Sequence, residues 1–383
     1  MRGAAVEQSL AFGQEGRSPD GPNDRVCGAV RLVQRLVRCI GLKRRRSGSG
    51  VGGPDANTTG ATSSLSMSRK MSNFTPTNRD LPAYADMKHL FSTFFILLLG
   101  ALLHAQEHNF EFISNHIYLN AEVNGKPARL VFDTGSADVY LDSTWLSESG
   151  IKYAQMGNVM VRGAGNEAKK TTLIFSGVNI SMNGKEYSPM MVPIIDLRVI
   201  LGDKADGIFG LKDLKGKVIT IDYKNSKLTL SDKLTTDPAE GFTRIPIETD
   251  TNHPGRILFA IEVTVTPGKV ISGKALLDIG SGQGLHFTSK AAAKYELDKI
   301  QDKVYFHHEH GGVGGESAGY EFGIDKVTTG NLLLFQGKAR YSTDHSGAMA
   351  SDEYIAVLGN EIWQHFTVII DLSKSMLFLK ENL

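Results

Sequence analysis

Two aspartates in the sequence each follow an apolar stretch and precede a similar short motif. Asp133 follows Leu-Val-Phe and continues as Thr-Gly-Ser, whereas Asp278 follows Ala-Leu-Leu and continues as Ile-Gly-Ser. This recurrence predicts a duplicated lobe in which the two carboxyl groups meet. Two carboxyl groups in contact cannot both ionise cheaply, so their titration splits into a lower and a higher pKa. Such a pair can supply a base and an acid to one reaction.

The elements that must position the aspartates recur at matched spacing. A glycine precedes Asp222 and another precedes Asp371 at the same distance along the chain. A leucine follows each of these aspartates, again at the same distance in the two halves. The interval from Asp133 to the first of these glycines is nearly the same as that from Asp278 to the second. This register indicates two copies of a unit of roughly 130 residues, which is too few and too long for a solenoid repeat.

The sequence between these landmarks is typical of β-strands separated by tight turns. Asn124-Gly125 and Asn183-Gly184 are strong hairpin signals, and short apolar runs flank them. A single short helix is expected to begin at residues 143–146. With 41% hydrophobic and 22% charged residues, the composition is that of a globular protein. We therefore predict a mainly β fold.

The motif Asp-Thr-Gly-Ser after apolar residues resembles the catalytic loop of the aspartic protease superfamily. The resemblance is to pepsin-like and retroviral-type (retropepsin-like) peptidases, in a secreted bacterial form with two fused lobes. Two further segments, 208–210 (Ile-Phe-Gly) and 357–360 (Val-Leu-Gly-Asn), resemble the elements that pack behind the aspartate loops. The likeness covers nearly all of residues 112–380. It implies a bilobal, double-psi β-barrel-like fold with pseudo-twofold duplicated lobes.

The resemblance assigns catalytic roles to Asp133 and Asp278. The ionised carboxylate would take a proton from a water molecule as it attacks a peptide carbonyl, which the protonated carboxyl polarises. The glycines of the two motifs would let the backbone turn tightly, and the serine hydroxyls would donate hydrogen bonds to the carboxylates. The residues expected to support the pair are Thr134, Gly135, Ser136, Ile279, Gly280 and Ser281.

Two Gly-rich turns lie where the retroviral-type enzymes carry flaps that close over an extended peptide. Tyr140 either lines the site or belongs to the core, and Asp138 either accepts hydrogen bonds from substrate backbone or caps its own turn. The expected flap residues are Gly163, Ala164, Gly165, Gly312, Val313 and Gly314.

Ile279 departs from the family pattern, because the residue after the catalytic aspartate is nearly always Thr or Ser. That hydroxyl bonds across to the loop of the other lobe, so half of this contact is missing here. We expect Ile279 to pack as an apolar residue and Thr134 to find a main-chain partner across the interface. The hypotheses are a secreted endopeptidase acting on a peptide or protein, and a catalytically silent binding module with the same fold.

The first 105 residues have a different character from the rest. Residues 1–86 form a low-complexity extension, which is expected to be disordered or to result from a misread start at Met1 instead of Met87. Residues 87–105 have the layout of a signal peptide, whose apolar run at 90–103 is short for a membrane span. The mature protein would begin near Gln106 and be secreted or periplasmic, or anchored through residues 90–103 if uncleaved. The lobes are expected at 106–235 and 241–383.

The remaining composition limits the partners that we expect. The formal net charge of +1 gives no support for nucleic-acid binding, and both cysteines, Cys27 and Cys39, precede the predicted lobes. The run 307–310 (His-His-Glu-His) could ligate a metal, although no helix pattern places these side chains on one face, so a solvated turn edge is favoured. We expect a monomer with no cofactor and no metal.

Overall fold

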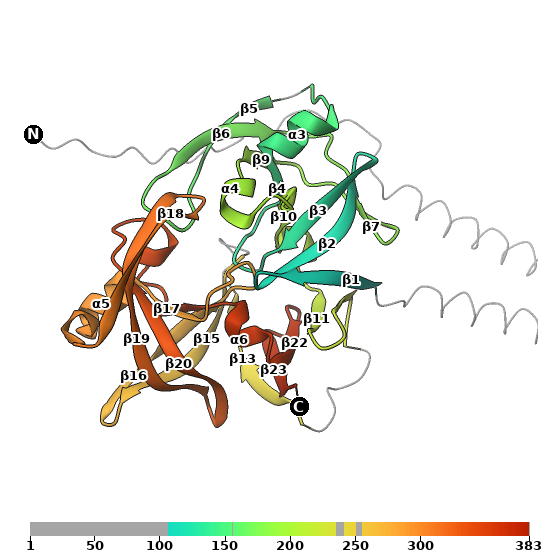
Figure 1. Cartoon of the computed structure of the whole chain (residues 1–383). Helices are drawn as coiled ribbons and strands as arrows, with labels where there is room; N and C mark the ends of the chain where they lie inside the picture. The colour runs from blue at the N-terminus through green and yellow to red at the C-terminus, as the bar shows by residue number, and fades with distance from the viewer. Residues whose placement is uncertain (1–105, 155, 235–240, 250–254, 383) are drawn as a thin grey trace, which may run out of the picture. The chain divides into compact units, whose positions relative to one another are not determined.

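Strands dominate the part of the chain that the computed structural model describes, which is residues 106–154, 156–234, 241–249 and 255–382 (Figure 1). This confirms the mainly β fold class with duplicated lobes. The elements of the first lobe are β1 (Gln106–Ile113), β2 (His116–Val123), β3 (Lys126–Phe132), β4 (Tyr140–Asp142), α3 (Ser143–Ser149), β5 (Met156–Val161), β6 (Lys169–Ile174), β7 (Ile180–Met182), β8 (Lys185–Tyr187), β9 (Val192–Ile195), α4 (Arg198–Leu201), β10 (Gly207–Phe209), η1 (Lys212–Leu214), β11 (Val218–Asp222) and β12 (Lys227–Ser231).

The second lobe repeats this strand-rich pattern with longer hairpins. Its elements are β13 (Thr243–Pro246), β14 (Glu248–Thr249), β15 (Ile257–Thr266), β16 (Lys269–Leu277), β17 (Leu285–Phe287), α5 (Ser289–Lys294), η2 (Leu297–Lys299), β18 (Lys303–Gly312), β19 (Gly315–Thr329), β20 (Leu332–Ser342), η3 (Ala348–Ala350), β21 (Ala356–Leu358), α6 (Asn360–Trp363), β22 (Phe366–Asp371) and β23 (Met376–Glu381). The first lobe's α3 begins at Ser143 as predicted, but it is one of several short helices in the described residues, not a single one.

Local sequence explains how the strands turn. At the predicted hairpins, Asn124 and Gly125 have φ values of 49° and 75°, and Asn183 and Gly184 have φ values of 46° and 78°. Positive φ at both central residues is what a type I′ turn requires, and Asn-Gly tolerates it. The helix α3 begins where the buried Asp142 carboxylate accepts hydrogen bonds from the N–H groups two and three residues later.

The two lobes place equivalent strands around each aspartate. In the first lobe β3 runs parallel to β10, which is antiparallel to β4; in the second, β16 runs parallel to β21, which is antiparallel to β17. Asp133 directly follows β3 and Asp278 directly follows β16. The spatial order around each aspartate is therefore the same, as expected for a duplication.

One sheet joins the lobes, with strand order β13-β23-β22-β11-β12-β1. Its centre is the antiparallel pair β11 and β22, in which Thr220 lies opposite Ile369. These residues stand two positions before Asp222 and Asp371, the matched landmarks of the two copies. Two equivalent residues that face each other mark the position of the pseudo-twofold axis.

The core is continuous across both lobes, because one cluster of buried hydrophobic side chains contains residues from β2 and β3 as well as from β15, β16 and β22. Within the described residues, no helix has the length and hydropathy needed to cross a membrane. The apolar run at 90–103 and the extension 1–86 lie outside the described residues.

A fully buried asparagine, Asn360, links the lobes through side-chain hydrogen bonds. Its Nδ2 donates to the backbone carbonyl of Asn115 at 2.8 Å and to that of Ile279 at 2.5 Å, and its Oδ1 accepts from the Tyr223 hydroxyl at 2.5 Å. Asn115 in turn donates to the Gly282 carbonyl at 3.0 Å. One side chain thus ties the second aspartate loop to the first lobe.

We predict that Asn360→Ala lowers the free energy of unfolding by about 2–4 kcal/mol, because it leaves buried polar partners without hydrogen bonds. Urea unfolding measures the change. The matched control is Asn331→Ala at an exposed position, where a change within about 0.5 kcal/mol is expected. Equal effects of the two substitutions would contradict the role of Asn360.

Candidate active site

The loops that carry Asp133 and Asp278 meet between the lobes. The Asp133 N–H donates to the Phe209 carbonyl at 3.1 Å, and the Asp278 N–H donates to the Leu358 carbonyl at 3.0 Å, so each loop leaves its strand in the same way. The two carboxyl groups are hydrogen-bonded to each other. The structure therefore brings together the two residues that the repeat singled out.

Backbone N–H groups converge on both carboxyl groups. Asp133 Oδ1 accepts from the N–H of Gly135 at 2.7 Å and from that of Ser136 at 3.1 Å. Asp278 Oδ1 accepts from the N–H of Ser281 at 3.1 Å, and the Gly280 N–H is a further donor. Each loop thus stabilises negative charge without a basic side chain.

Burial raises the pKa of both carboxyl groups against the opposing effect of these donors. For Asp133, burial outweighs the hydrogen bonds; for Asp278, burial and the negative charge of Asp133 place the pKa well above its usual value. Both residues keep some solvent-accessible surface, so water can reach them. The pair therefore retains a proton at pH values where an isolated aspartate has lost it.

Glycine is required behind each aspartate because the loops approach so closely. A Cβ on Gly135 would lie 2.7 Å from the Asp278 carboxyl carbon, and a Cβ on Gly280 would overlap the Asp133 carboxyl group. Each glycine thus makes room for the carboxyl group of the other lobe, which is a stricter demand than the tight turn that the sequence suggested.

Thr134 makes the contact across the interface that the sequence led us to expect. Its hydroxyl donates to the Leu277 carbonyl at 2.9 Å and accepts from the Ile279 N–H at 2.9 Å, and it is fully buried. Ile279 is also fully buried and belongs to the hydrophobic core. The contact is asymmetric, because the Thr134 side chain of the first lobe bonds to the second lobe, whereas Ile279 has no hydroxyl. The Asn360 side chain donates a hydrogen bond to the Ile279 carbonyl.

The elements that resembled family motifs pack directly behind the loops. The Leu211 N–H donates to the Ser136 carbonyl at 3.0 Å, and the Asn360 N–H donates to the Ser281 carbonyl at 2.7 Å. A Cβ on Gly210 would lie 2.7 Å from the Ser136 carbonyl oxygen, so a glycine is needed for this approach.

The expectation that the Ser136 hydroxyl donates to Asp133 was wrong. The Ser136 hydroxyl donates to the Asp138 carbonyl at 3.1 Å rather than to Asp133, and the Ser281 hydroxyl accepts from the Gln283 N–H at 3.3 Å. The serines reach the carboxylates through their backbone N–H groups. The Asp138 carboxylate forms a salt bridge with Lys212 at 3.0 Å, and a contact of Asp138 with substrate backbone stays a prediction.

Tyr140 is partly buried and lies at the edge of the site. It packs against the cluster that contains Val131 and Ile208, and burial together with the negative charges of Asp138 and Asp133 raises its pKa to about 12. Its hydroxyl also interacts with the Ser136 side chain. Tyr140 thus packs against a core cluster, and its role in lining a substrate site stays a prediction.

The two Gly-rich turns contact each other. The Gly314 N–H donates to the Ala164 carbonyl at 2.6 Å, and the Glu167 N–H donates to the Gly314 carbonyl at 2.9 Å. Gly163 lies close to the Val313 side chain, Gly165 lies close to Gly314, and Gly312 lies close to Ala164. All six residues predicted for these turns therefore meet at one place.

Each turn also carries an apolar side chain to the opposite lobe. Val313 of the second lobe packs against the cluster of Tyr118, Val131 and Ile208. Ala164 of the first lobe packs against the cluster of Leu276, Val357, Met349 and Tyr354. Because Val131 and Leu276 stand two residues before Asp133 and Asp278, they face the same side as the aspartates. The turns thus cover the faces beside the carboxyl pair.

Polar contacts that the sequence did not reveal hold the first turn to the second lobe. The Asn166 side chain donates to Asp344 at 3.3 Å and accepts from the His345 N–H at 2.8 Å, while the Ser346 hydroxyl donates to the Asn166 carbonyl at 2.5 Å. The buried Asp344 also accepts from the Ser317 hydroxyl at 2.8 Å. Nothing in the local sequence marks these residues, because they lie far along the chain from Asn166.

No three His, Cys, Asp or Glu side chains gather into a metal-binding group within the described ranges. In the run 307–310, His307 Nε2 lies 3.5 Å from Glu316, and the His308 ring lies 5.4 Å from the Phe306 ring. Phe306 is thus the neighbour that the His308 ring packs against.

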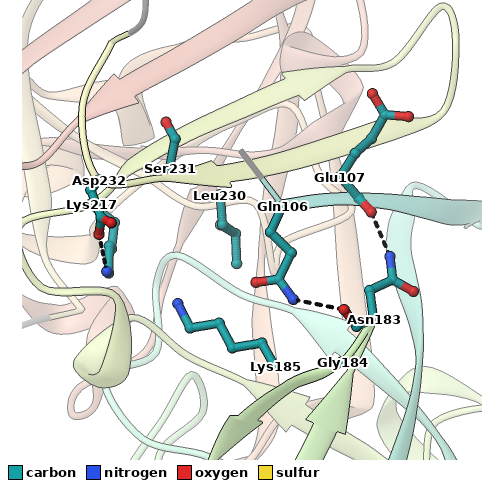
Figure 2. A pocket seen from close by; sticks show the side chains of 9 residues that line it. All are labelled: Gln106, Glu107, Asn183, Gly184, Lys185, Lys217, Leu230, Ser231 and Asp232. Atoms are coloured by element: carbon teal, nitrogen blue, oxygen red, sulfur yellow. Dashed lines mark hydrogen bonds and ion pairs between the residues drawn. The ribbon is translucent and has the colours of Figure 1, made fainter. Parts of the chain in front are cut away.

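A hollow of about 420 Å³ lies elsewhere, beside the start of β1 (Figure 2). Lys185 extends toward the Lys217–Asp232 ion pair at its edge. Its lining residues are Gln106, Glu107, Asn183, Gly184, Lys185, Lys217, Leu230, Ser231 and Asp232. None of them belongs to the aspartate loops or the Gly-rich turns.

A family model described as aspartyl protease matches residues 119–212. The match supports an aspartic protease family for this chain. It includes Asp133, the first Gly-rich turn and the Ile208-Phe209-Gly210 element, and it suggests a peptidase. No curated protein matches the sequence.

We predict that Gly280→Ala destabilises the protein and removes any activity that depends on the pair, because the new methyl group overlaps Asp133. Urea unfolding and the Asp133–Asp278 geometry in a crystal structure measure the effect. Gly323→Ala is the matched control, since an exposed strand glycine with no atom near its Cβ position should accept alanine without loss. Normal stability and geometry in Gly280→Ala would contradict the close approach.

We predict that Asp278→Asn makes the folded protein more stable than the natural sequence at neutral pH. The native pKa is raised, so the unfolded chain ionises first, and stability falls as pH rises from about 3.8 toward the raised value. The variant lacks this loss at residue 278. Urea unfolding between pH 4 and pH 8 tests the prediction, with Asp325→Asn at an exposed position as the control. A difference from the natural protein that does not grow with pH would contradict it.

Proposed function

We propose that the protein is an aspartic endopeptidase that hydrolyses peptide bonds through Asp133 and Asp278. The observation that carries the proposal is the pair of enclosed, mutually hydrogen-bonded carboxyl groups with raised pKa values, one from each lobe. A pair of like carboxyl groups with no catalytic role would lower the stability of the protein and contribute nothing to its function. The aspartyl protease match over the first lobe supports the same function.

In the proposed reaction the two carboxyl groups share one proton and hold a water molecule between them. The ionised group takes a proton from the water as the water oxygen attacks the peptide carbonyl carbon, and the protonated group donates to the carbonyl oxygen. Collapse of the tetrahedral intermediate breaks the C–N bond, and the proton taken from water passes to the leaving amine. The backbone N–H groups on Asp133 and Asp278 keep the charged form accessible.

The Gly-rich turns would act as flaps over an extended peptide. Their mutual hydrogen bonds, and the packing of Val313 and Ala164 on the opposite lobes, occupy the faces that a substrate needs. Substrate entry would therefore require the turns to separate. Glycine at the tips suits this motion, and the released backbone groups can pair with the peptide.

The activity is tested by peptide hydrolysis with an unfolded protein as substrate at several pH values. Asp133→Asn and Asp278→Asn should each lower the rate by at least about a hundredfold, since general acid–base catalysis contributes roughly 10² to 10⁴. The matched control is Asp325→Asn, an exposed carboxylate remote in sequence from both loops. All variants must be shown to fold.

Ile279→Thr decides between the enzyme and the silent module. The substitution adds a hydroxyl at the buried site and removes apolar volume, so its stability effect is modest and its activity should equal or exceed that of the natural protein. Hydrolysis by the Thr variant alone would mean that the natural chain is a binding module silenced at Ile279. Hydrolysis by Asp278→Asn at the natural rate would overturn the shared-proton mechanism.

We also propose that residues 87–105 act as a signal peptide that is removed during export. The mature protein would then act as a monomer outside the cytoplasm. Mass spectrometry of protein from its native host should give an N-terminus near Gln106, the first residue of β1. Peptides from residues 1–86 in that material would contradict a start at Met87, and an uncleaved 90–103 segment would favour the membrane-anchored form.

A further inference from the structure

The strand register lines up one row of side chains beside the aspartate in each lobe. In the first lobe the row is Tyr118, Val131, Ile208 and Tyr140, each opposite the next on neighbouring strands. All four pack in one hydrophobic cluster, so this face is apolar apart from the tyrosine hydroxyls.

The equivalent row of the second lobe changes character along its length. It starts with Leu258, Leu276 and Val357, and continues through His286 to Arg340. Val357 and His286 occupy the places that Ile208 and Tyr140 hold in the first lobe. The row therefore begins apolar beside Asp278 and is cationic only at Arg340 on β20, which pairs with β17 (Figure 1).

Arg340 is held beside the Asp278 loop. Its guanidinium donates to Glu321 through Nε at 3.1 Å and to the Gln283 side chain through Nη1, and Gln283 stands five residues after Asp278. The guanidinium carbon lies 5.1 Å from the centre of the Phe306 ring, and His286 packs edge-on against the same ring at 5.7 Å. These neighbours thus fix the orientation of the Arg340 guanidinium.

The charges around Arg340 do not cancel. Glu321 is shared between Arg340 and Lys338, which bonds its other oxygen at 2.9 Å, so two cations face one carboxylate. Burial, and then the charge of Arg340, lowers the pKa of His286 to about 3, and the same two causes lower that of His308. Both imidazoles are therefore neutral near pH 7, and the net charge of this group is positive.

The first lobe differs at the loop position equivalent to Gln283. Asp138, five residues after Asp133, pairs with Lys212 at 3.0 Å, and this is a balanced ion pair. A peptide lying across both lobes would therefore meet an apolar, neutral face on one side of the reacting bond and a cationic end on the other. Arg340 keeps guanidinium N–H groups beyond the two hydrogen bonds that it makes with described residues.

We propose that Arg340 is a specificity-determining residue that selects substrates with an acidic side chain near the cleaved bond, on the side that lies over the second lobe. The inference rests on the proposed function and names its substrate class. A carboxylate can accept hydrogen bonds from the partly exposed guanidinium, whereas an uncharged amide gains less from it. Glu321 competes with the substrate for the same cation.

The test uses pairs of peptides that differ only by Glu or Gln at each position flanking a mapped cleavage site. We expect kcat/KM to be about tenfold higher for Glu at one position on one side. Arg340→Gln should abolish this preference and Arg340→Lys should retain part of it. Glu321→Gln should increase it. Loss of the preference in Arg340→Lys as complete as in Arg340→Gln, or no increase in Glu321→Gln, would overturn the role of Arg340.

Lys338→Gln is the matched control, because it removes the same charge and the same carboxylate partner, but the Lys338 side chain is 72% exposed and precedes Arg340 on β20. It should weaken the preference less than Arg340→Gln does, because the guanidinium proposed to contact the substrate remains although Glu321 then pairs with Arg340 alone. An equal loss in Lys338→Gln would mean that net charge, not Arg340, is responsible and would overturn the inference. So would hydrolysis of Glu and Gln peptides at equal rates by the natural protein.

Binding measurements separate this inference from the proposed function. Fluorescence anisotropy with Asp133→Asn reports peptide affinity without turnover. If Glu peptides bind more tightly through Arg340 but the natural protein hydrolyses no peptide, the inference is supported and the endopeptidase is overturned. Hydrolysis without any acidic preference in rate or binding would overturn the inference alone.

Discussion

The contact between the enclosed carboxyl groups of Asp133 and Asp278 is the interaction that the surrounding loops and strands must accommodate. Burial raises the pKa of both Asp133 and Asp278, and the negative charge of the first adds to the effect on the second. Such a pair persists only if the protein holds the loops in contact and shares a proton between them. The donors on each carboxylate, the glycine at each turn and the joined sheet all serve this contact.

The means of holding the two loops are not symmetric. Thr134 reaches across to the Leu277 carbonyl and the Ile279 N–H, but Ile279 has no hydroxyl to return the bond. Asn360 instead joins the Ile279 carbonyl to the first lobe through its side chain. A duplicated fold can lose one symmetric contact when another buried side chain links the two lobes by hydrogen bonds of its own.

The same asymmetry extends from the loops to the faces beside them. Equivalent register positions carry Tyr140 in one lobe and His286 in the other, and the second row ends in Arg340. The turn tips, which cross to opposite lobes through Ala164 and Val313, cover the apolar part of each row. The backbone is thus duplicated while the side chains give the two halves of the site different chemistry.

The sequence by itself determined the strand-rich fold, the two Asp-containing loops and the glycines behind them. These are local signals: apolar strands before Asp133 and Asp278, Asn-Gly turns, and spacings that recur because each copy must rebuild the same strand order. Only the tertiary structure decided which side chains meet across the lobes. Asn360, the Asp138–Lys212 pair and the row ending in Arg340 depend on strand register and on segments far apart in the chain. No local pattern encodes such contacts, because a polar side chain takes whichever partner the packed backbone brings within reach.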